Sequence, residues 1–410
     1  MSVIEAHDVY KVFGRRPERA VERLREGATR EELRSQGLTP AVIDASFDVQ
    51  SGEIFVVMGL SGSGKSTLIR MVNGLLTPTS GTIRVAGTEV HSLDARGLRE
   101  LRREQVSMVF QHFALLPHRT VGENAGYGLK LRGLNRADRE RRTEDALGMV
   151  GLDGWAESLP GELSGGMRQR VGLARALAAG TDVMLMDEAF SALDPLIRRE
   201  MQDQLIELQH KLDKTVLFIT HDLNEAMRLG DRVAMMRDGR IVQIGTAEQI
   251  LNDPANDYVA QFVQDVDRTR VLTASSVMEQ PVAVLGGEQG PRAAHKLMRE
   301  HQLGSLMVVD RERNLRGVVM ATDVAQAVER GQSDLAGVLM PAVTVAPDTA
   351  VADLFAASAD SPTALAVVDG ERLLGVIPQV TLLSALGAVG GNRTPDPDGL
   401  TGTTREEVAP

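Results

Sequence analysis

The stretch "EIFVVMGLSGSGKSTLIRMV", residues 53–72, gives the strongest indication of the fold. It begins with an apolar run typical of a buried strand, continues through glycine and serine, and ends in apolar residues at helical spacing. Its central part, "GLSGSGKST" at 59–67, matches the pattern GxxxxGK[ST] of phosphate-binding loops. That pattern requires a strand before it and a helix after it, and both are predicted here. The stretch therefore predicts a nucleotide-binding α/β domain rather than a Gly/Ser-rich surface turn.

The loop contains the residue types that a bound triphosphate requires. Gly59, Gly62 and Gly64 let backbone N–H groups turn inward around phosphate oxygens, where side chains would obstruct them. The N-terminus of the following helix adds a positive dipole end. Lys65 is expected to reach the β- and γ-phosphates, and the Ser66 hydroxyl to ligate Mg²⁺. The ATP-binding residues predicted in this loop are Gly59, Leu60, Ser61, Gly62, Ser63, Gly64, Lys65, Ser66 and Thr67.

Two adjacent acids end another apolar run, "DVMLMDE" at 182–188. Asp187 and Glu188 repel each other and are costly to bury without partners. Either they lie at a solvated strand end by chance, or a cation lies beside them. Because open α/β sheets bind ligands at the carboxyl ends of their strands, we favour the cation. Asp187 would then hold the Mg²⁺ bound to Ser66, and Glu188 would accept a proton from the water that attacks the γ-phosphate.

Three further segments extend the predicted site. "ELSGGMRQR", 162–170, places Ser164, Gly165 and Gly166 before a helix, which predicts a second phosphate-binding N-terminus. One nucleotide does not need two such cradles, so a facing subunit is a natural explanation. Gln111, in "FQHFALLPHRTV", and His221, in "ITHD", stand at the ends of two other predicted strands. Alone each would more often be structural, but together with the acids they indicate a site.

The surrounding pattern, to about residue 262, alternates apolar runs with amphipathic helical segments and predicts a mainly parallel sheet with helices. The predicted strands are 53–59, 106–111, 182–188 and 215–222, and predicted helices cover 68–76, 166–180 and 197–212. A charged, helix-prone insert at about 15–40 interrupts the pattern, and Thr29 with Glu32 forms a candidate capping box in it. We interpret the insert as a solvated helical decoration.

The second part of the chain contains an internal repeat. "GSLMVVDRERNLRGVVMATDVAQAV" at 304–328 matches "TALAVVDGERLLGVIPQVTLLSAL" at 363–386, with one residue dropped. The repeats are expected at 273–330 and 335–388, and each is too small to bury much alone, so the pair should pack as one module. Residues 389–410 are Gly/Pro/Thr-rich and polar, which predicts a disordered tail.

Composition narrows the function. Of the 410 residues 43% are hydrophobic and 25% charged, as in ordinary soluble domains, and there is no cysteine to form a disulfide or a thiolate metal site. No run of about 18 apolar residues predicts a membrane span, and no secretion signal is evident at the N-terminus. The formal charge of −11 argues against general affinity for nucleic acid or anionic lipid.

The order of these motifs resembles the ATP-binding subunit of ABC transporters, from Phe13 to about residue 262: the phosphate loop, the Gln111 segment, "LSGGM", "MDE", "SALD" and "ITHD". The resemblance implies that Phe13 stacks on adenine and that Ser164 to Gly166 bind the γ-phosphate across a homodimer interface. It implies that Asp194 connects the two sites. The catalytic residues would be Glu188, His221 and Lys65, and the Mg²⁺ ligands Ser66, Gln111 and Asp187.

The segments "MDEAFSALDPLIR" and "FQHFALLPH" and the charged insert resemble those of the ATP-binding subunits of glycine betaine/proline betaine importers. These subunits also carry a C-terminal pair of CBS repeats. This resemblance implies an ABC ATP-binding domain over 1–262 that acts at the cytoplasmic face of the membrane. Its partners would be permease subunits and a substrate-binding protein, without nucleic acid. The repeats depart from the nucleotide-binding CBS pattern, because the place of Asp323 is taken by Thr381 in the second copy. An adenine-nucleotide regulator and a packing or dimerisation module therefore both stay open.

Two other functions remain as alternatives. An ABC ATPase that acts on nucleic acid or ribosomes usually has two cassettes or coiled-coil insertions, whereas this chain shows one cassette and no long heptads. A motor for the import of another solute, such as polar amino acids, is disfavoured only by the insert and the CBS pair.

Overall fold

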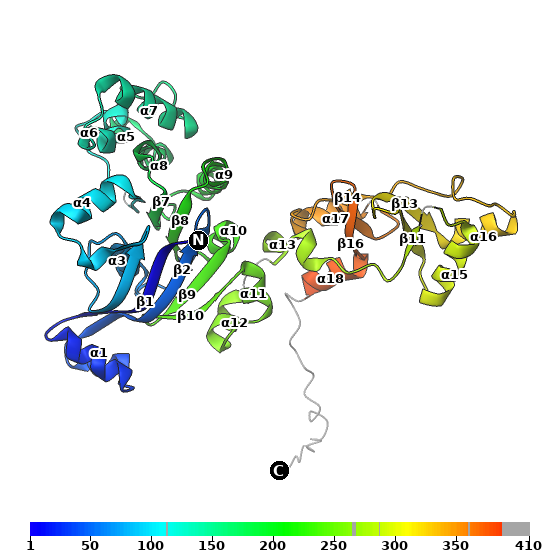
Figure 1. Cartoon of the computed structure of the whole chain (residues 1–410), viewed down its shortest axis with the longest axis horizontal. Coiled ribbons are helices and arrows are strands. Elements are labelled where there is room, and N and C mark those ends of the chain that lie inside the picture. Colours follow the sequence, from blue (N-terminus) through cyan, green and yellow to red (C-terminus); the bar gives the residue numbers. More distant parts are fainter. Residues whose placement is uncertain (112–113, 265–267, 287, 360, 388–410) are drawn as a thin grey trace, which may run out of the picture. The chain divides into compact units, whose positions relative to one another are not determined.

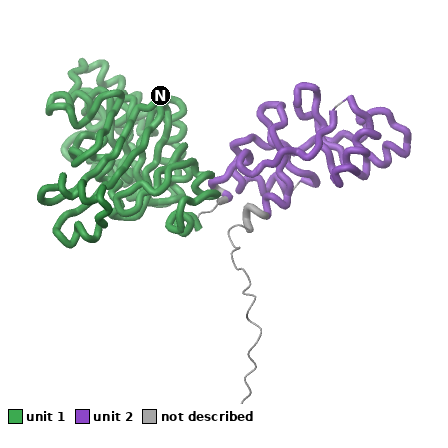
Figure 2. The backbone as a smooth tube through the Cα atoms, turned by 60° about the horizontal axis from the view of Figure 1, so that its bottom comes forward, with its two compact units in different colours: residues 1–266 green, residues 267–410 purple. Residues whose placement is uncertain are grey.

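The computed structural model describes residues 1–111, 114–264, 268–286, 288–359 and 361–387 (Figure 1). The contacts between Cα atoms divide the chain into two compact units, Met1–Val266 and Asp267–Pro410, drawn in green and purple in Figure 2. We call them unit 1 and unit 2 and describe each by itself. The tail predicted at 389–410 lies outside the described residues. Within those residues, no helix combines the length and the apolar character needed to cross a membrane.

Unit 1 is built on a six-stranded sheet whose strand order is β10-β9-β3-β8-β7-β6. Its strands are β3 (Ile54–Met58), β6 (Val106–Val109), β7 (Val183–Asp187), β8 (Thr215–Thr220), β9 (Arg232–Arg237) and β10 (Arg240–Gly245). All neighbours pair in parallel except β9 and β10, which form an antiparallel hairpin. The four strands expected from the sequence are therefore present, and β3, β7 and β8 are buried along their whole length, as their continuous apolar runs predict.

A second, antiparallel sheet in unit 1 has the order β2-β1-β4-β5. Its strands are β1 (Ser2–Phe13), β2 (Thr39–Gln50), β4 (Ser80–Val85) and β5 (Thr88–Glu89). Phe47 of β2 stacks on Phe55 of β3 with ring centroids 5.4 Å apart, and one hydrophobic cluster includes residues of both sheets.

The insert between β1 and β2 folds into α1 (Pro17–Arg25) and α2 (Arg30–Ser35). Thr29 caps α2, and the capping box with Glu32 is confirmed. The prediction that the insert is helical is confirmed and most of its residues are exposed, but it is not solvated throughout. Leu24 of α1 and Leu33 of α2 are buried in a cluster with Tyr10 of β1, because the apolar face of each short helix packs on the antiparallel sheet.

The remaining helices of unit 1 are α3 (Lys65–Val72), α4 (Ala95–Glu104), α5 (Val121–Ala125), α6 (Tyr127–Leu131), α7 (Arg136–Met149), α8 (Gly165–Ala179), α9 (Pro195–Leu212), α10 (Leu223–Leu229), α11 (Ala247–Asn252) and α12 (Asp257–Val263), with short 3-10 turns at Val90–Ser92 and Pro160–Glu162. Helices α5–α8 pack on one another as a helical subdomain (Figure 1). The helix predicted at 68–76 ends earlier, because Asn73 caps α3 and Gly74 turns with a φ of +64°.

Unit 2 contains two three-stranded sheets, β11-β12-β13 and β14-β15-β16. Its elements are α13 (Arg268–Val271), α14 (Ala274–Val277), β11 (Val284–Gly286), α15 (Pro291–His301), β12 (Ser305–Val309), β13 (Leu315–Met320), α16 (Ala321–Glu329), β14 (Thr344–Val345), α17 (Val351–Ala359), β15 (Leu365–Asp369), β16 (Arg372–Ile377) and α18 (Gln379–Gly387). Both sheets have one parallel and one antiparallel pairing, which matches the internal repeat. Met307 and Ala366 belong to one shared hydrophobic cluster, so the two copies pack together as predicted.

Candidate functional site

The phosphate-binding loop lies between β3 and α3 and packs tightly against its neighbours. A Cβ atom on Gly59 would come within 2.2 Å of the Met236 carbonyl oxygen, and one on Gly64 within 2.1 Å of the Ala41 carbonyl oxygen. Their φ angles of +152° and +105° also favour glycine. The loop therefore requires glycine at both positions for two reasons, close backbone contact and left-handed geometry.

Lys65 begins α3 and folds back under the loop. Its ammonium group donates to the carbonyl oxygens of Gly59 at 2.7 Å and Leu60 at 3.2 Å, and the side chain is only 4% exposed. Burial lowers the pKa of Lys65, while the negative charges of Glu188 and Asp187 oppose that shift. The result is a cation held in place at the floor of the loop, with Glu188 Oε1 3.9 Å away.

Ser66 and Asp187 meet although they are far apart in the sequence. The Ser66 hydroxyl donates to Asp187 Oδ1 at 3.0 Å, and the end of β7 buries Asp187 to 7% exposure. Burial raises the pKa of Asp187, and the bond from Ser66 partly offsets that rise. A hydroxyl and a carboxylate oxygen side by side are hard ligands that suit Mg²⁺, which keeps several waters and needs few protein ligands. These two residues therefore fit the expected metal.

Glu188 lies at the centre of the polar cluster. Its φ of +47° is left-handed, a costly conformation for a residue with a Cβ, and backbone bonds to Ile219 and Ser191 hold it there. Its carboxylate accepts a hydrogen bond from Gln111 Nε2 at 3.2 Å, and His221 Nδ1 lies 3.1 Å from the same oxygen. The structure thus brings Glu188, Gln111 and His221 together from the ends of β7, β6 and β8.

A cavity of about 310 Å³ opens above the loop. Its lining residues are Arg30, Arg34, Thr39, Ala41, Ser61, Gly62, Gly64, Lys65, Ser66, Thr67 and Glu188. Sequence reasoning missed Arg30, Arg34, Thr39 and Ala41. The capping box at Thr29 predicted where α2 begins, but no local pattern shows that this helix folds back toward a loop 30 residues later.

The remaining predicted site residues do not line this cavity. Ser164 caps α8, accepting from the Met167 N–H at 3.2 Å, and Gly165 and Gly166 form the first turn of that helix. Asp194 caps α9 and accepts from the Ile197 N–H. Phe13, at the end of β1, is 40% exposed, and Lys11 Nζ lies 5.2 Å from its ring centroid.

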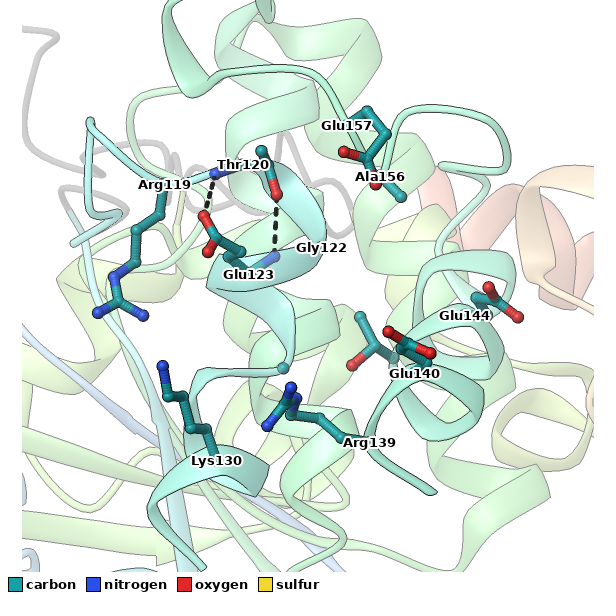
Figure 3. Close-up of a pocket in the computed structure, with 12 residues that line it drawn as sticks. Arg119, Thr120, Gly122, Glu123, Lys130, Arg139, Glu140, Glu144, Ala156 and Glu157 are labelled. Atoms are coloured by element: carbon teal, nitrogen blue, oxygen red, sulfur yellow. Dashed lines mark hydrogen bonds between the residues drawn. The ribbon is translucent and has the colours of Figure 1, made fainter. Parts of the chain in front are cut away.

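A second cavity, of about 500 Å³, lies in the helical subdomain. Figure 3 shows the basic Arg119 and Lys130 on the left with the acidic Glu123 beside Arg119, and the acidic Glu140 and Glu157 on the right.

The fold and these clusters define a P-loop ATPase cassette of the ABC type. The ABC transporter family model matches residues 42–191, and the CBS domain model matches residues 274–330. A solved ATP-binding cassette dimer, in a post-hydrolysis state with ADP and Pi, is 29% identical with a TM-score of 0.51, and the match covers 60% of this chain and 98% of that chain. The predicted fold class is confirmed.

More specific relatives narrow the class. The glycine betaine/carnitine transport ATP-binding protein of Listeria monocytogenes is 47% identical over 94% of this chain and 98% of its own length. The glycine betaine transport ATP-binding protein of Bacillus subtilis is 46% identical over 99% and 97%. The chain belongs to this family, the ATP-binding subunits of ABC-type glycine betaine and related quaternary-amine transporters. It is therefore an ATP-binding ABC ATPase, and the resemblance seen in the sequence is confirmed.

Proposed function

We propose that this chain hydrolyses ATP to drive the import of glycine betaine, proline betaine or a related quaternary amine through separate membrane subunits. The observation that carries the ATPase mechanism is the position of Glu188, held by Gln111 and His221 beside the buried Lys65. The family membership supports the class of solute, and no residue of this chain needs to contact that solute.

In the proposed mechanism, the backbone N–H groups of residues 59–64 and the Lys65 ammonium group bind the β- and γ-phosphates. Ser66, Asp187 and Gln111 would hold Mg²⁺, which would supply positive charge to neutralise the phosphates. Asp187 is buried beside Ser66, and a cation held there would offset the cost of burying its charge.

Glu188 is the general base in this proposal. Its carboxylate accepts the proton of the attacking water, and the left-handed backbone directs it toward the cavity from the end of β7. Gln111 and His221 contact the same carboxylate oxygen, so they fix its orientation, and His221 is positioned to steady charge in the transition state.

The complete site needs a second copy of unit 1. Ser164, Gly165 and Gly166 present a helix N-terminus suited to phosphate, yet none of them lines the cavity of their own chain. A head-to-tail homodimer would place this segment opposite the γ-phosphate of the partner copy, with Phe13 stacking on adenine and Asp194 near the interface.

The charged cavity of the helical subdomain is the proposed docking surface for a permease subunit. Its charges of both signs favour a polar segment of mixed charge. The motor would then lie peripherally at the cytoplasmic face of the membrane, and a separate binding protein would deliver the solute.

We assign unit 2 a regulatory role rather than a catalytic one. The Thr381 hydroxyl donates to Glu279 at 2.5 Å, so the place of the expected ribose-binding Asp is used within the unit. Acidic residues outnumber basic ones over 263–410, and salt would screen their contacts over about 8–10 Å. This favours a response to ionic strength over an adenine-nucleotide regulator.

Reconstituted transport tests the proposed function. The chain is assembled with its permease subunits and binding protein in vesicles, and uptake of labelled glycine betaine, carnitine and methionine is measured with ATP inside. We expect ATP-dependent uptake of the two quaternary amines, and none with Glu188→Gln. Uptake of methionine alone would assign the motor to another solute.

A further inference from the structure

The insert between β1 and β2 reaches the phosphate-binding loop through Arg30. This first residue of α2 has a side chain that is 9% exposed. Its guanidinium donates from Nη2 to the Gly62 carbonyl at 2.9 Å and from Nη1 to Asp238 Oδ1 at 2.7 Å. Its Nε donates to the Pro40 carbonyl at 3.2 Å. One planar fork of donors therefore joins three segments that are distant in the sequence.

A second contact holds the loop from the β9–β10 turn. The Gly239 N–H donates to the Ser63 carbonyl at 3.0 Å, next to the Asp238 that binds Arg30. The Gly239 carbonyl in turn accepts from the Ile43 N–H of β2 at 2.7 Å. The carbonyl oxygens of two consecutive loop residues, Gly62 and Ser63, are thus bonded to groups outside the loop. This limits the loop's freedom before a nucleotide binds, which lowers the entropy cost of binding.

Arg34 brings a second positive charge of α2 to the same cavity. It lies four residues after Arg30, hence on the same face of the helix, and both residues line the cavity with Lys65. Arg34 is exposed, and among the described residues it forms no ion pair. Buried Leu33 and the Thr29–Glu32 capping box fix the helix that carries it.

We propose that α2 forms one wall of the ATP site, with Arg30 as a positioning residue of the phosphate-binding loop and Arg34 as a direct ligand of the triphosphate. This rests on the proposed ATP site. A cation at the mouth of the cavity complements the triphosphate, whose charge Lys65 alone does not balance. The insert is then part of the nucleotide site and not an appendage beside it.

Equilibrium binding of ATP to the full-length chain tests the role of Arg30. Arg30→Ala should raise the Kd for ATP about tenfold, because a loosened loop no longer presents its N–H groups in one arrangement. In hydrolysis, KM should rise while kcat at saturating ATP changes less than about threefold, since Glu188 is untouched. Arg30→Lys retains one or two of the three contacts, so its Kd for ATP should lie between those of the wild type and Arg30→Ala.

Arg23→Ala is the matched control, because Arg23 is an arginine of the same insert whose side chain contacts Gln36 within the insert. It should leave the Kd for ATP unchanged within twofold. If Arg30→Ala instead lowers the general stability of the protein, kcat and kcat/KM should fall together, and Arg30→Lys should not restore them. That result would overturn the positioning role of Arg30.

Arg34 is tested by comparing ATP with adenosine. Arg34→Ala should weaken ATP about tenfold and leave adenosine unchanged, and Arg34→Lys should restore most of the ATP affinity. Wild-type ATP affinity in Arg34→Ala would overturn the direct contact. Lys65→Ala distinguishes an error in the role of α2 from an error in the ATP site. If Lys65→Ala does not bind ATP while the Arg30 and Arg34 variants bind it normally, only the proposed role of α2 is wrong. If Lys65→Ala also binds normally, the proposed ATP site itself is wrong.

Discussion

In unit 1, three parallel strands of one sheet, β6, β7 and β8, place polar side chains at their carboxyl ends, and a fourth, β3, leads into the phosphate-binding loop. In unit 2 the strands are divided between two small sheets. Thr381, in the helix α18 that follows β16, donates a hydrogen bond to Glu279 of the same unit. Both units consist of strands and helices. Parallel neighbours in one sheet bring polar side chains together at a shared edge, whereas the paired repeats mainly form an interface with each other.

Of the variants considered, one at Glu188, the proposed general base of unit 1, should change turnover most. Glu188→Gln keeps the shape of the side chain and removes its ability to take a proton, so turnover should fall about 10²–10⁴-fold while ATP still binds. Steady-state hydrolysis and equilibrium ATP binding measure the two effects separately. Asp323→Asn in unit 2 is the control and should leave both unchanged. If Glu188→Gln hydrolyses ATP near the wild-type rate, Glu188 is not the general base.

Two glycines, Gly64 in unit 1 and Gly370 in unit 2, should respond differently to replacement by alanine. Gly64→Ala places a Cβ 2.1 Å from the Ala41 carbonyl oxygen at a φ of +105°, so the loop must move and ATP affinity should fall at least about tenfold. Gly370, in the β15–β16 turn, also has a positive φ, but a Cβ there meets nothing within 4 Å. Gly370→Ala should cost about 1–2 kcal/mol of stability in unit 2 and leave ATP affinity unchanged. Equal losses of ATP affinity in both variants would contradict the assignment of the loop.

At neutral pH, the buried and ionised carboxylate of Asp187 should lower the free energy of unfolding of unit 1. Because burial raises its pKa in the folded state, its stabilising contribution is complete at low pH and is lost as the pH rises through the folded-state pKa. At neutral pH, Asp187→Asn should therefore raise the unfolding temperature of the nucleotide-free protein by a few degrees while weakening Mg²⁺-dependent ATP binding. Calorimetry between pH 4 and 8 would check this, since the gain should be smallest at the acidic end. If Asp187→Asn is less stable than the wild type at neutral pH, burial of the Asp187 carboxylate does not lower the stability of unit 1.

The smallest effect is expected in unit 2. Thr381→Asp restores the carboxylate found at Asp323 in the first repeat, but places it beside Glu279, where like charges repel. We expect a loss of at most about 1 kcal/mol of stability, and the stoichiometry of ATP binding should stay at one per chain. A second bound nucleotide in this variant would show that unit 2 is a nucleotide site that lacks one residue.

Local patterns predicted most of the strands whose carboxyl ends form the proposed site. The strands around 53–59, 106–111, 182–188 and 215–222 were visible as apolar runs, and parallel pairing then brings their ends together. The capping box at Thr29 was visible for the same reason, because it is confined to four residues.

The contacts that sequence reasoning missed are long-range and made by single side chains. Arg30 and Asp238 are 208 positions apart, and nothing in either neighbourhood marks the pair. The burial of part of the insert was missed for the same reason. Its charged residues outnumber its apolar ones, yet the few apolar residues, such as Leu24 and Leu33, are those that pack.

We propose that ATP is hydrolysed in a site shared by two copies of unit 1, and mixing two inactive variants tests this proposal. Lys65→Ala disables the loop, and Ser164→Arg disables the segment that should face the partner's nucleotide, so each homodimer has no intact site. A heterodimer has one intact site, formed by the loop of one chain and the Ser164 segment of the other. We predict that the mixture regains hydrolysis well above either variant alone, in proportion to heterodimers counted by native mass spectrometry. Heterodimers that form but hydrolyse no faster than the separate variants would contradict the shared site.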